Sequence, residues 1–257
     1  MNRRHILQLT SAALTGCSLT ACTIPKPSGN AATKRRIRAI CFDLLTIFDP
    51  RSVVKLAETV WPGRGAELCS VWRTRQFEYS WVRVAGQRYA DFRVVTEEAL
   101  VFAARDRKLD LSDEARRTLV DACSELDPWP DAEGMIRSWR ESGLRLAPLS
   151  NYAPAMLERV ISKAGLSGMF ETLISTDEVR SFKPDPRAYA LGPSRLGLDR
   201  EEIVFAAFGG WDAAGAKWFG FPTFWVNRLG VSAEELSPPP DGSGPNLSGL
   251  AAFITGR

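Results

Sequence analysis

Histidine is almost absent from this chain of 257 residues, since the sequence holds only one, His5. It lies in the N-terminal segment, ahead of the region where a globular fold is predicted. Catalysis by Ser-His-Asp or Cys-His arrangements and metal sites built on histidine are therefore excluded from the folded body. Any hydrolytic activity has to use carboxylates, lysine, hydroxyl groups or a bound cation.

Cysteine is scarce as well, with five in the chain. Cys17 and Cys22 belong to the N-terminal segment, which leaves Cys41, Cys69 and Cys123 for the folded body. Three cysteines at irregular spacing form neither a disulfide framework nor a metal-binding pattern. Cys41 lies within an apolar run and is predicted to be a small buried hydrophobic residue.

Strong net charge and long apolar runs are also missing. The formal net charge is +3, apolar residues make up 45% of the chain and charged residues 25%. This is the composition of an ordinary globular protein. It favours no nucleic-acid partner, and the length fits one elaborated domain.

The first 33 residues are predicted to be an export signal and linker. Arg3 and Arg4 precede a short apolar stretch, as in bacterial twin-arginine signals, and the stretch is shorter than the about 20 residues that span a bilayer. Leu-Thr-Ala before Cys22 resembles a lipoprotein processing site, with Cys17 as a second candidate. We expect an exported protein, periplasmic or attached to the membrane by a lipid on Cys22. The alternative is a cytoplasmic N-terminal helix.

Strand and helix patterns alternate along most of the remaining chain. Apolar runs predict strands at residues 38–42, 144–149, 172–175, 203–207 and 223–226, and helices at 132–142, 154–164, 186–196 and 212–219 lie between the later strands. This alternation predicts an α/β fold with a doubly wound parallel sheet. Residues 237–249, rich in Pro, Gly and Ser, are predicted to be a loop before a short terminal element.

Residues 50–127 interrupt this alternation. Their apolar side chains recur at helical spacing, without the alternation that marks a strand. We therefore predict an all-helical cap inserted after the first strand, between two core segments, residues 36–49 and 128–257.

Polar side chains follow the predicted strands. They are Asp43 with Thr46, Ser150 with Asn151, Lys183, and Asp212. Taken alone, Asp43 would more simply be a turn or helix-capping residue. Because the carboxyl ends of parallel strands face one crevice, the clusters together predict a functional site.

The segment Ile40–Val53, ICFDLLTIFDPRSV, resembles the nucleophile motif of the L-2-haloacid dehalogenases, a family within the haloacid dehalogenase superfamily. Further matches extend the resemblance from Arg38 to Gly230: Val71-Trp72-Arg73, Glu78–Trp81 with Arg88–Phe92, Leu149–Asn151, Phe182–Asp185 with Tyr189, Trp211–Ala213 and Gly220–Thr223.

The resemblance implies that Asp43 attacks the halogen-bearing α-carbon of a small 2-haloacid, and that water then hydrolyses the resulting ester. It implies that Thr46, Ser150 and Lys183 orient Asp43 and keep it ionised, and that Asp212 is the base for the water. The expected substrate contacts are Arg73, for the carboxylate or the departing halide, with Asn151, Tyr189, Trp211 and Leu45. Trp72, Trp81 and Trp211 are expected to wall an apolar pocket. The resemblance implies no cofactor or metal, and it favours a homodimer.

The chain departs from the family pattern in three places. The loop from Asp43 to Thr46 is one residue shorter, and Ala207 and Gly209 replace a serine and an asparagine. Leu45 stands where phosphatases of the superfamily carry a second aspartate, which argues against phosphate-ester hydrolysis. Three functions therefore remain open: a haloacid dehalogenase, a related hydrolase such as a Mg²⁺-dependent phosphatase, and a binding protein that has lost turnover.

Overall fold

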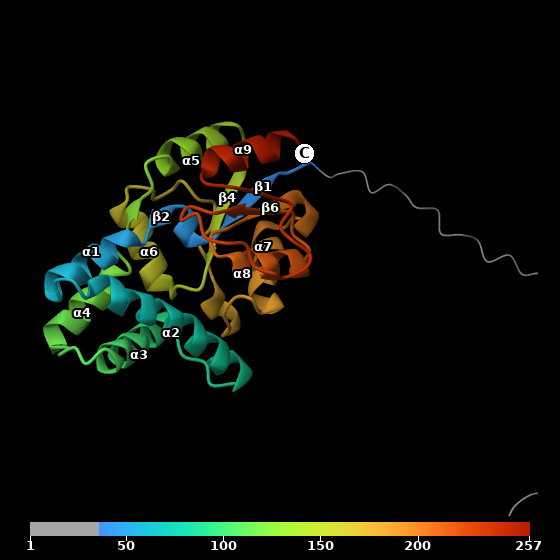
Figure 1. Cartoon of the computed structure of the whole chain (residues 1–257). Coiled ribbons are helices and arrows are strands. Elements are labelled where there is room, and N and C mark those ends of the chain that lie inside the picture. The colour runs from blue at the N-terminus through green and yellow to red at the C-terminus, as the bar shows by residue number, and fades with distance from the viewer. Residues whose placement is uncertain (1–35) are drawn as a thin grey trace, which may run out of the picture. The chain divides into compact units, whose positions relative to one another are not determined.

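The computed structural model describes residues 36–257, and a six-stranded parallel sheet lies at their centre (Figure 1). Its strand order is β5-β4-β1-β6-β7-β8. The bounds are Ala39–Phe42 for β1, Arg145–Ser150 for β4, Ile174–Ser175 for β5, Ile203–Ala207 for β6, Thr223–Val226 for β7 and Gly242–Gly244 for β8.

Alternate residues of the central strands pack into two separate apolar layers. Ile40 and Phe42 of β1 belong to the layer that includes α5 (Ala132–Glu141), α6 (Pro154–Lys163) and α9 (Leu247–Thr255). Ala39 and Cys41 belong to the other layer, with α7 (Pro186–Leu196) and α8 (Gly210–Phe219). Helices thus cover both faces, as a fully buried parallel sheet requires. The predicted doubly wound α/β fold is confirmed, and so is the burial of Cys41.

Four helices form the insertion that follows β1. They are α1 (Arg51–Val60), α2 (Gly65–Ala85), α3 (Phe92–Asp106) and α4 (Asp113–Ala122), and they lie together beside the sheet layers (Figure 1). The chain leaves and re-enters through a two-stranded antiparallel sheet of β2 (Phe48–Asp49) and β3 (Asp127–Pro128). The all-helical cap is thus present as predicted.

Local residue choice explains how the cap helices begin and pack. The side chain of Asp91 accepts hydrogen bonds from the first backbone amides of α3, and Ser112 does the same for α4. A Cβ on Gly65 would lie 2.4 Å from the backbone nitrogen of Glu58. Glycine at this position therefore lets α2 approach α1 closely.

One predicted loop was wrong in part. Residues 237–249 contain β8 and the start of α9. The Gly-Ser-Gly backbone of β8 pairs with β7, and the ring of Phe224 lies so close to Gly242 and Gly244 that a Cβ there would be 3.0 to 3.1 Å from it. A strand of small residues covered by a neighbouring ring lacks the apolar alternation by which strands are recognised. No helix between residues 36 and 257 is long and apolar enough to cross a membrane.

Candidate active site

Asp43 follows β1 directly, at the carboxyl end of the central strand. Its backbone amide donates to the carbonyl of Ala206 at 2.8 Å, which continues the β1–β6 pairing by one residue. Its carboxylate Oδ1 accepts a hydrogen bond of 2.9 Å from the amide of Leu45, in the short 3-10 helix Leu44–Thr46. Asp43 is therefore held by the sheet on one side and by the following turn on the other, with 17% of its side chain exposed.

Lys183 lies between two carboxylates. Its Nζ is 2.7 Å from Asp43 Oδ2 and 2.8 Å from Asp212 Oδ2, and only 1% of its side chain is exposed. Burial alone would lower the pKa of Lys183, but the charges of Asp212 and Asp43 outweigh it and raise the pKa above its usual value. Lys183 is therefore a buried cation that bridges the two carboxylates.

Asp212 is enclosed by Lys183 and Tyr189. The Tyr189 hydroxyl donates to Asp212 Oδ1 at 2.6 Å, and the Asp212 side chain is fully buried. Burial raises the pKa of Asp212 to about 6, with the charge of Asp43 adding to the rise and Lys183 opposing it. Tyr189 was expected to contact the substrate. In the structure its ring is buried in the layer of α7 and α8, and its hydroxyl donates to Asp212 instead.

The raised pKa of Asp212 leads to a pH-dependence of stability. The folded chain keeps a proton on Asp212 up to about pH 6, whereas an unfolded aspartate releases it near 3.8. The contribution of Asp212 to the free energy of unfolding is thus largest below pH 3.8 and is lost as pH rises through 6. We expect the difference in unfolding free energy between wild type and Asp212→Asn to shift over this range and to be constant above it. Urea unfolding at a series of pH values measures it, and a pH-independent difference would contradict the raised pKa.

Thr46, Ser150 and Asn151 lie around this group in different ways. The Thr46 hydroxyl donates to the backbone carbonyl of Asp43 at 2.7 Å, so it fixes the turn rather than the carboxylate. Ser150 Oγ accepts from the amide of Tyr152 at 3.1 Å, and its side chain lines the cavity beside Asp43. Asn151 Oδ1 accepts from the amide of Lys183 at 2.9 Å, which leaves the Asn151 Nδ2 group free to donate.

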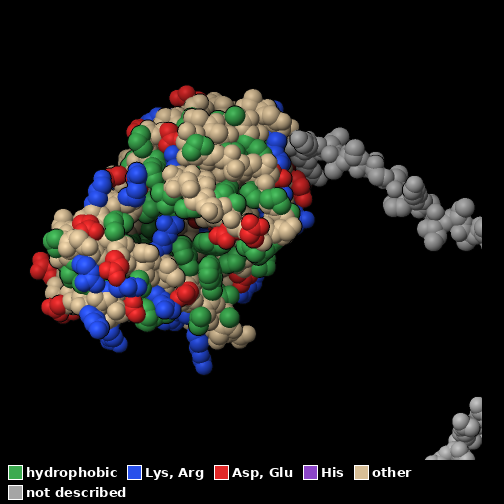
Figure 2. Space-filling model, viewed as in Figure 1, with side chains coloured by type: hydrophobic (Ala, Val, Ile, Leu, Met, Phe, Trp, Pro, Cys, Tyr) green, Lys and Arg blue, Asp and Glu red, His purple; other side chains and the backbone are tan. Residues whose placement is uncertain are grey.

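A cavity of about 460 Å³ opens in front of Asp43. Figure 2 shows the molecule hollowed on this side, with Lys or Arg side chains at the hollow. Residues from the cap and from the sheet line it together, and most are apolar, among them Leu45, Val54, Trp72, Phe92, Leu126 and Leu229. A size within the range of ~300 to 1,000 Å³ and a few converging polar groups are typical of a small-molecule site.

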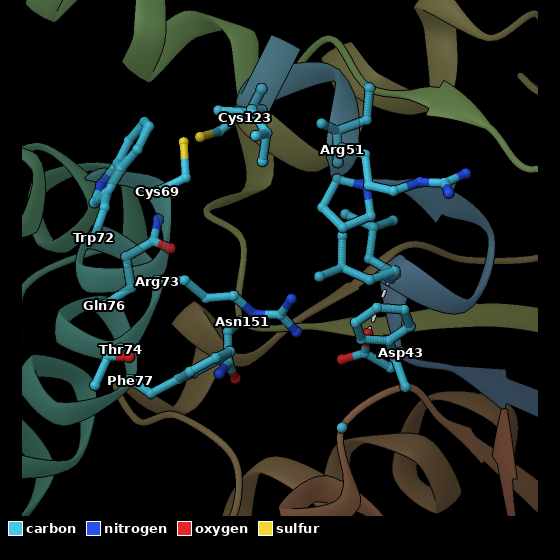
Figure 3. A pocket seen from close by; sticks show the side chains of 18 of the residues that line it. Asp43, Arg51, Cys69, Trp72, Arg73, Thr74, Gln76, Phe77, Cys123 and Asn151 are labelled. Atoms are coloured by element: carbon cyan, nitrogen blue, oxygen red, sulfur yellow. Dashed lines mark hydrogen bonds between the residues drawn. The ribbon is translucent and has the colours of Figure 1, made fainter. Parts of the chain in front are cut away.

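Arg73 extends from α2 across the cavity toward Asp43 (Figure 3). Its guanidinium lies over the rings of Phe208 and Phe77, at 5.2 and 5.8 Å from their centroids, and no carboxylate of residues 36–257 forms an ion pair with it. Burial lowers the pKa of Arg73 from its usual value, while the nearby carboxylate of Asp43 opposes this change. A half-buried cation without an ion-pair partner is well suited to receive an anion.

The predicted aromatic wall is formed in part. Trp72 and Trp211 line the cavity. Trp81 does not, because it packs edge-on against Trp211 and donates from Nε1 to the carbonyl of Lys183 at 3.2 Å. Trp81 therefore links the cap to the segment that carries Lys183.

Three residues of the site escaped the sequence interpretation. Phe77 and Phe208 flank Arg73, and both carry only apolar side chains in apolar surroundings, so no chemical signal marks them. Arg228 is buried and donates to the carbonyl of Thr46 at 2.7 Å and to Asp131 at 2.7 Å, which holds the end of the turn after Asp43. Arg228 stands two residues after a predicted strand, and this place at the carboxyl end of the sheet is the signal that could have revealed it.

The part of the chain that the structure describes, residues 36–257, has no group of three His, Cys, Asp or Glu side chains placed to hold a metal ion.

Comparison with known proteins yields a consistent set of relatives. The chain is 45% identical over 206 residues to an (S)-2-haloacid dehalogenase of Pseudomonas sp. (strain YL), covering 80% of this chain and 89% of the relative. It is 37% identical to haloacetate dehalogenase H-2 of Moraxella sp. (strain B), covering 86% and 99%. A solved L-2-haloacid dehalogenase from Xanthobacter autotrophicus with chloropropionic acid covalently bound superposes with a TM-score of 0.80 at 35% identity, covering 86% and 99%.

The family model for haloacid dehalogenase-like hydrolases matches residues 37–220, which include β1, β4, β5 and β6 of the sheet, the cap and every residue of the Asp43–Lys183–Asp212 group. The family model matches most of the chain, and the relatives are matched over most of their own length. The chain therefore belongs to the haloacid dehalogenase-like hydrolases.

Proposed function

We propose that this protein hydrolyses (S)-2-haloacids through an ester formed on Asp43. The observation that carries the proposal is the arrangement of Asp43 and Arg73: a carboxylate, held by Lys183, faces a half-buried guanidinium without an ion pair across a mainly apolar cavity. Relatives of this chain carry the names (S)-2-haloacid dehalogenase and haloacetate dehalogenase.

The first step is a displacement at carbon. The free lone pairs of the Asp43 carboxylate attack the α-carbon, the carbon–halogen bond breaks with its electron pair, and halide leaves. Lys183 and the amide of Leu45 hold both oxygens in place, so little reorientation is needed before attack. The apolar walls strip water from the carboxylate and so strengthen it as a nucleophile.

The second step returns Asp43 to its free form. Water attacks the carboxyl carbon of Asp43, the bond from that carbon to the ester oxygen breaks, and a 2-hydroxy acid leaves. Asp212 is the proposed base, and its deprotonated form predominates above about pH 6. The α-carbon is inverted once, so an (S)-2-haloacid is expected to give an (R)-2-hydroxy acid.

The test is halide release from (S)-2-chloropropionate by purified protein with EDTA present. A single turnover in H₂¹⁸O is expected to give product without the label and protein with ¹⁸O on Asp43, because the product oxygen comes from the carboxylate. Label in the first product would show direct attack by water and would refute the ester. Absence of halide with every 2-haloacid of a series would refute the activity itself.

Removing the unpaired cation is expected to impair the first step. Arg73→Met should lower kcat/KM for 2-chloropropionate about 100-fold, because a hydrogen bond to a charged group is worth roughly 1.5 to 3 kcal/mol. Arg75→Met is the matched control on the same helix, since Arg75 lies outside the cavity lining and is paired with Glu78. Steady-state kinetics measures both variants, and equal effects would show that Arg73 has no direct part.

A phosphatase activity has less support in the site. Leu45 lines the cavity where an acid for a leaving alkoxide would be needed, and it carries no proton to donate. A binding protein without turnover would release at most one halide per chain, so the same halide assay with excess substrate distinguishes it.

We further propose export to the periplasm, with a lipid on Cys22 as the membrane anchor. The proposal concerns residues 1–33, which lie outside the described residues, and it rests on the Arg3-Arg4 pair and the Leu-Thr-Ala-Cys sequence. Arg3→Lys with Arg4→Lys should abolish processing, and Cys22→Ala should release the protein from membranes. Unchanged processing in the first variant would contradict the twin-arginine route.

A homodimer is proposed on the resemblance and on the exposed apolar side chains of the cap, such as Val82 and Val94. Light scattering during gel filtration gives the mass in solution, and a value of one chain would contradict it.

A further inference from the structure

Gly209 lies at a position where the backbone would accept any residue. Its φ is −83° and its ψ is 142°, which is ordinary extended geometry, so conformational freedom does not explain a glycine here. The constraint comes from a neighbour. A Cβ at this position would lie 2.8 Å from Trp211 Nε1 and 3.2 Å from Trp211 Cδ1. The indole of Trp211 thus occupies the space into which a side chain of residue 209 would extend.

The indole also brings a hydrogen-bond donor to that space. Trp211 Nε1 donates to no group within residues 36–257, in contrast to Trp72 and Trp81, whose Nε1 atoms donate to the carbonyls of Thr96 and Lys183. Trp211 Nε1 is not fully buried, so solvent can reach it. Trp211 and Gly209 both line the cavity beside Asp43.

The start of α8 sets the position of this donor in the cavity wall. Gly209 precedes the helix, and Trp211 and Asp212 lie in its first turn. Trp211 packs edge-on against Phe77 at 5.1 Å and against Trp81 at 5.5 Å between ring centroids, which fixes the plane of the indole. A donor in a fixed ring loses little freedom when it binds a water molecule.

Resting on the proposed function, we infer that Trp211 Nε1 holds the water that hydrolyses the Asp43 ester, in place of the polar side chain that residue 209 lacks. The indole N–H donates to the water oxygen and leaves one lone pair of that oxygen for attack on the carboxyl carbon. One proton of the water ends on the departing alkoxide, and the other passes to Asp212. The N–H of Trp211 is thereby a catalytic group of the second step, while its ring remains part of the cavity wall.

Trp211→Phe tests this assignment, because it removes the N–H and keeps an aromatic ring. We expect kcat to fall about tenfold, the scale of one lost hydrogen bond, and KM to fall with it, so that kcat/KM is unchanged. This pattern arises because kcat/KM covers only the steps up to and including halide loss. The value of kcat also depends on hydrolysis of the ester. Halide should appear in a burst of one per chain, and the peptide that contains Asp43 should carry the acyl mass in a quenched sample.

The control is Trp218→Phe. Trp218 is 55% exposed, its Nε1 donates to the carbonyl of Ser237, and neither residue lines the cavity. Its kinetics should equal those of wild type. If Trp211→Phe lowers kcat/KM together with kcat and no ester accumulates, the indole acts before halide loss and the inference is wrong.

A double variant tests independently whether Trp211 supplies the hydrogen-bond donor that residue 209 lacks. Gly209→Asn alone should impair turnover, since its Cβ collides with the indole. Combined with Trp211→Ala, it should restore ester hydrolysis, because the asparagine amide then supplies the donor and removal of the indole frees the space. Gly209→Leu with Trp211→Ala has similar volume without a donor and should restore nothing. Equal behaviour of the two double variants would overturn the inference.

The outcomes separate this inference from the proposed function. Wild type that releases no halide would overturn both. Wild type that turns over many substrates, with Trp211→Phe behaving identically, would overturn only the role of Trp211.

Discussion

Asp43→Asn is expected to lower halide release by at least about 10⁴-fold, the scale observed when a catalytic nucleophile is removed. The amide oxygen of asparagine can still accept from Lys183 Nζ, which is 2.7 Å from the native carboxylate, while the NH2 group cannot accept from the Leu45 amide and the negative charge is lost. A neutral amide is a far weaker nucleophile than a carboxylate. Chloride release from 2-chloropropionate over hours measures the residual rate.

The control for this substitution is Asp121→Asn, which removes an exposed carboxylate of the cap that is paired with Arg93. Its activity should equal that of wild type, and the melting temperatures of both variants should lie close to the native value. Substantial chloride release by Asp43→Asn would mean that another group or water attacks the α-carbon, and the ester mechanism would be wrong.

Lys183→Met is expected to lower the free energy of unfolding by about 3 to 5 kcal/mol, because it leaves the buried Asp212 and the partly buried Asp43 without their shared cation. Halide release should be lost as well, since one of the two carboxylates would then take up a proton. Chemical denaturation at neutral pH measures the loss of stability. For comparison, Lys163→Met breaks a half-exposed pair with Glu125 and should cost less than about 1 kcal/mol.

A second substitution identifies the cause of this loss. Adding Asp212→Asn to Lys183→Met removes one of the two repelling charges and should recover part of the stability. If the double variant were less stable than Lys183→Met, the destabilisation would come from lost packing of the lysine stem rather than from charge.

The sequence was sufficient for those parts of the fold that depend on local pattern. Apolar runs located the strands, and the glycines after two predicted helices, Gly143 and Gly165, have the positive φ values of 85° and 68° that end a helix. The strand of Gly242–Gly244 escaped prediction because its pairing with β7 depends on Phe224, which is distant in the sequence.

The site was predictable to the extent that polar residues follow strands. Asp43, Lys183 and Asp212 were expected to converge, and they form one chain of ion pairs. The partner of each hydroxyl was not predictable, because it depends on side-chain direction: Tyr189 serves Asp212, and Thr46 bonds a backbone carbonyl. The overlap of Gly209 with Trp211 also requires coordinates, since no rule of spacing relates them.

The short pair of β2 and β3 joins the two ends of the four-helix insertion, with Phe48 opposite Pro128 and Asp49 opposite Asp127. The insertion thus starts and finishes at neighbouring points, an arrangement that tolerates replacement of the intervening chain. Arg73 lies inside this exchangeable segment, whereas the ion-paired group of Asp43 lies outside it. Recognition of the substrate and the bond-breaking chemistry can therefore diverge separately in evolution, and a transplanted cap offers a route to new specificity on an unchanged ester-forming centre.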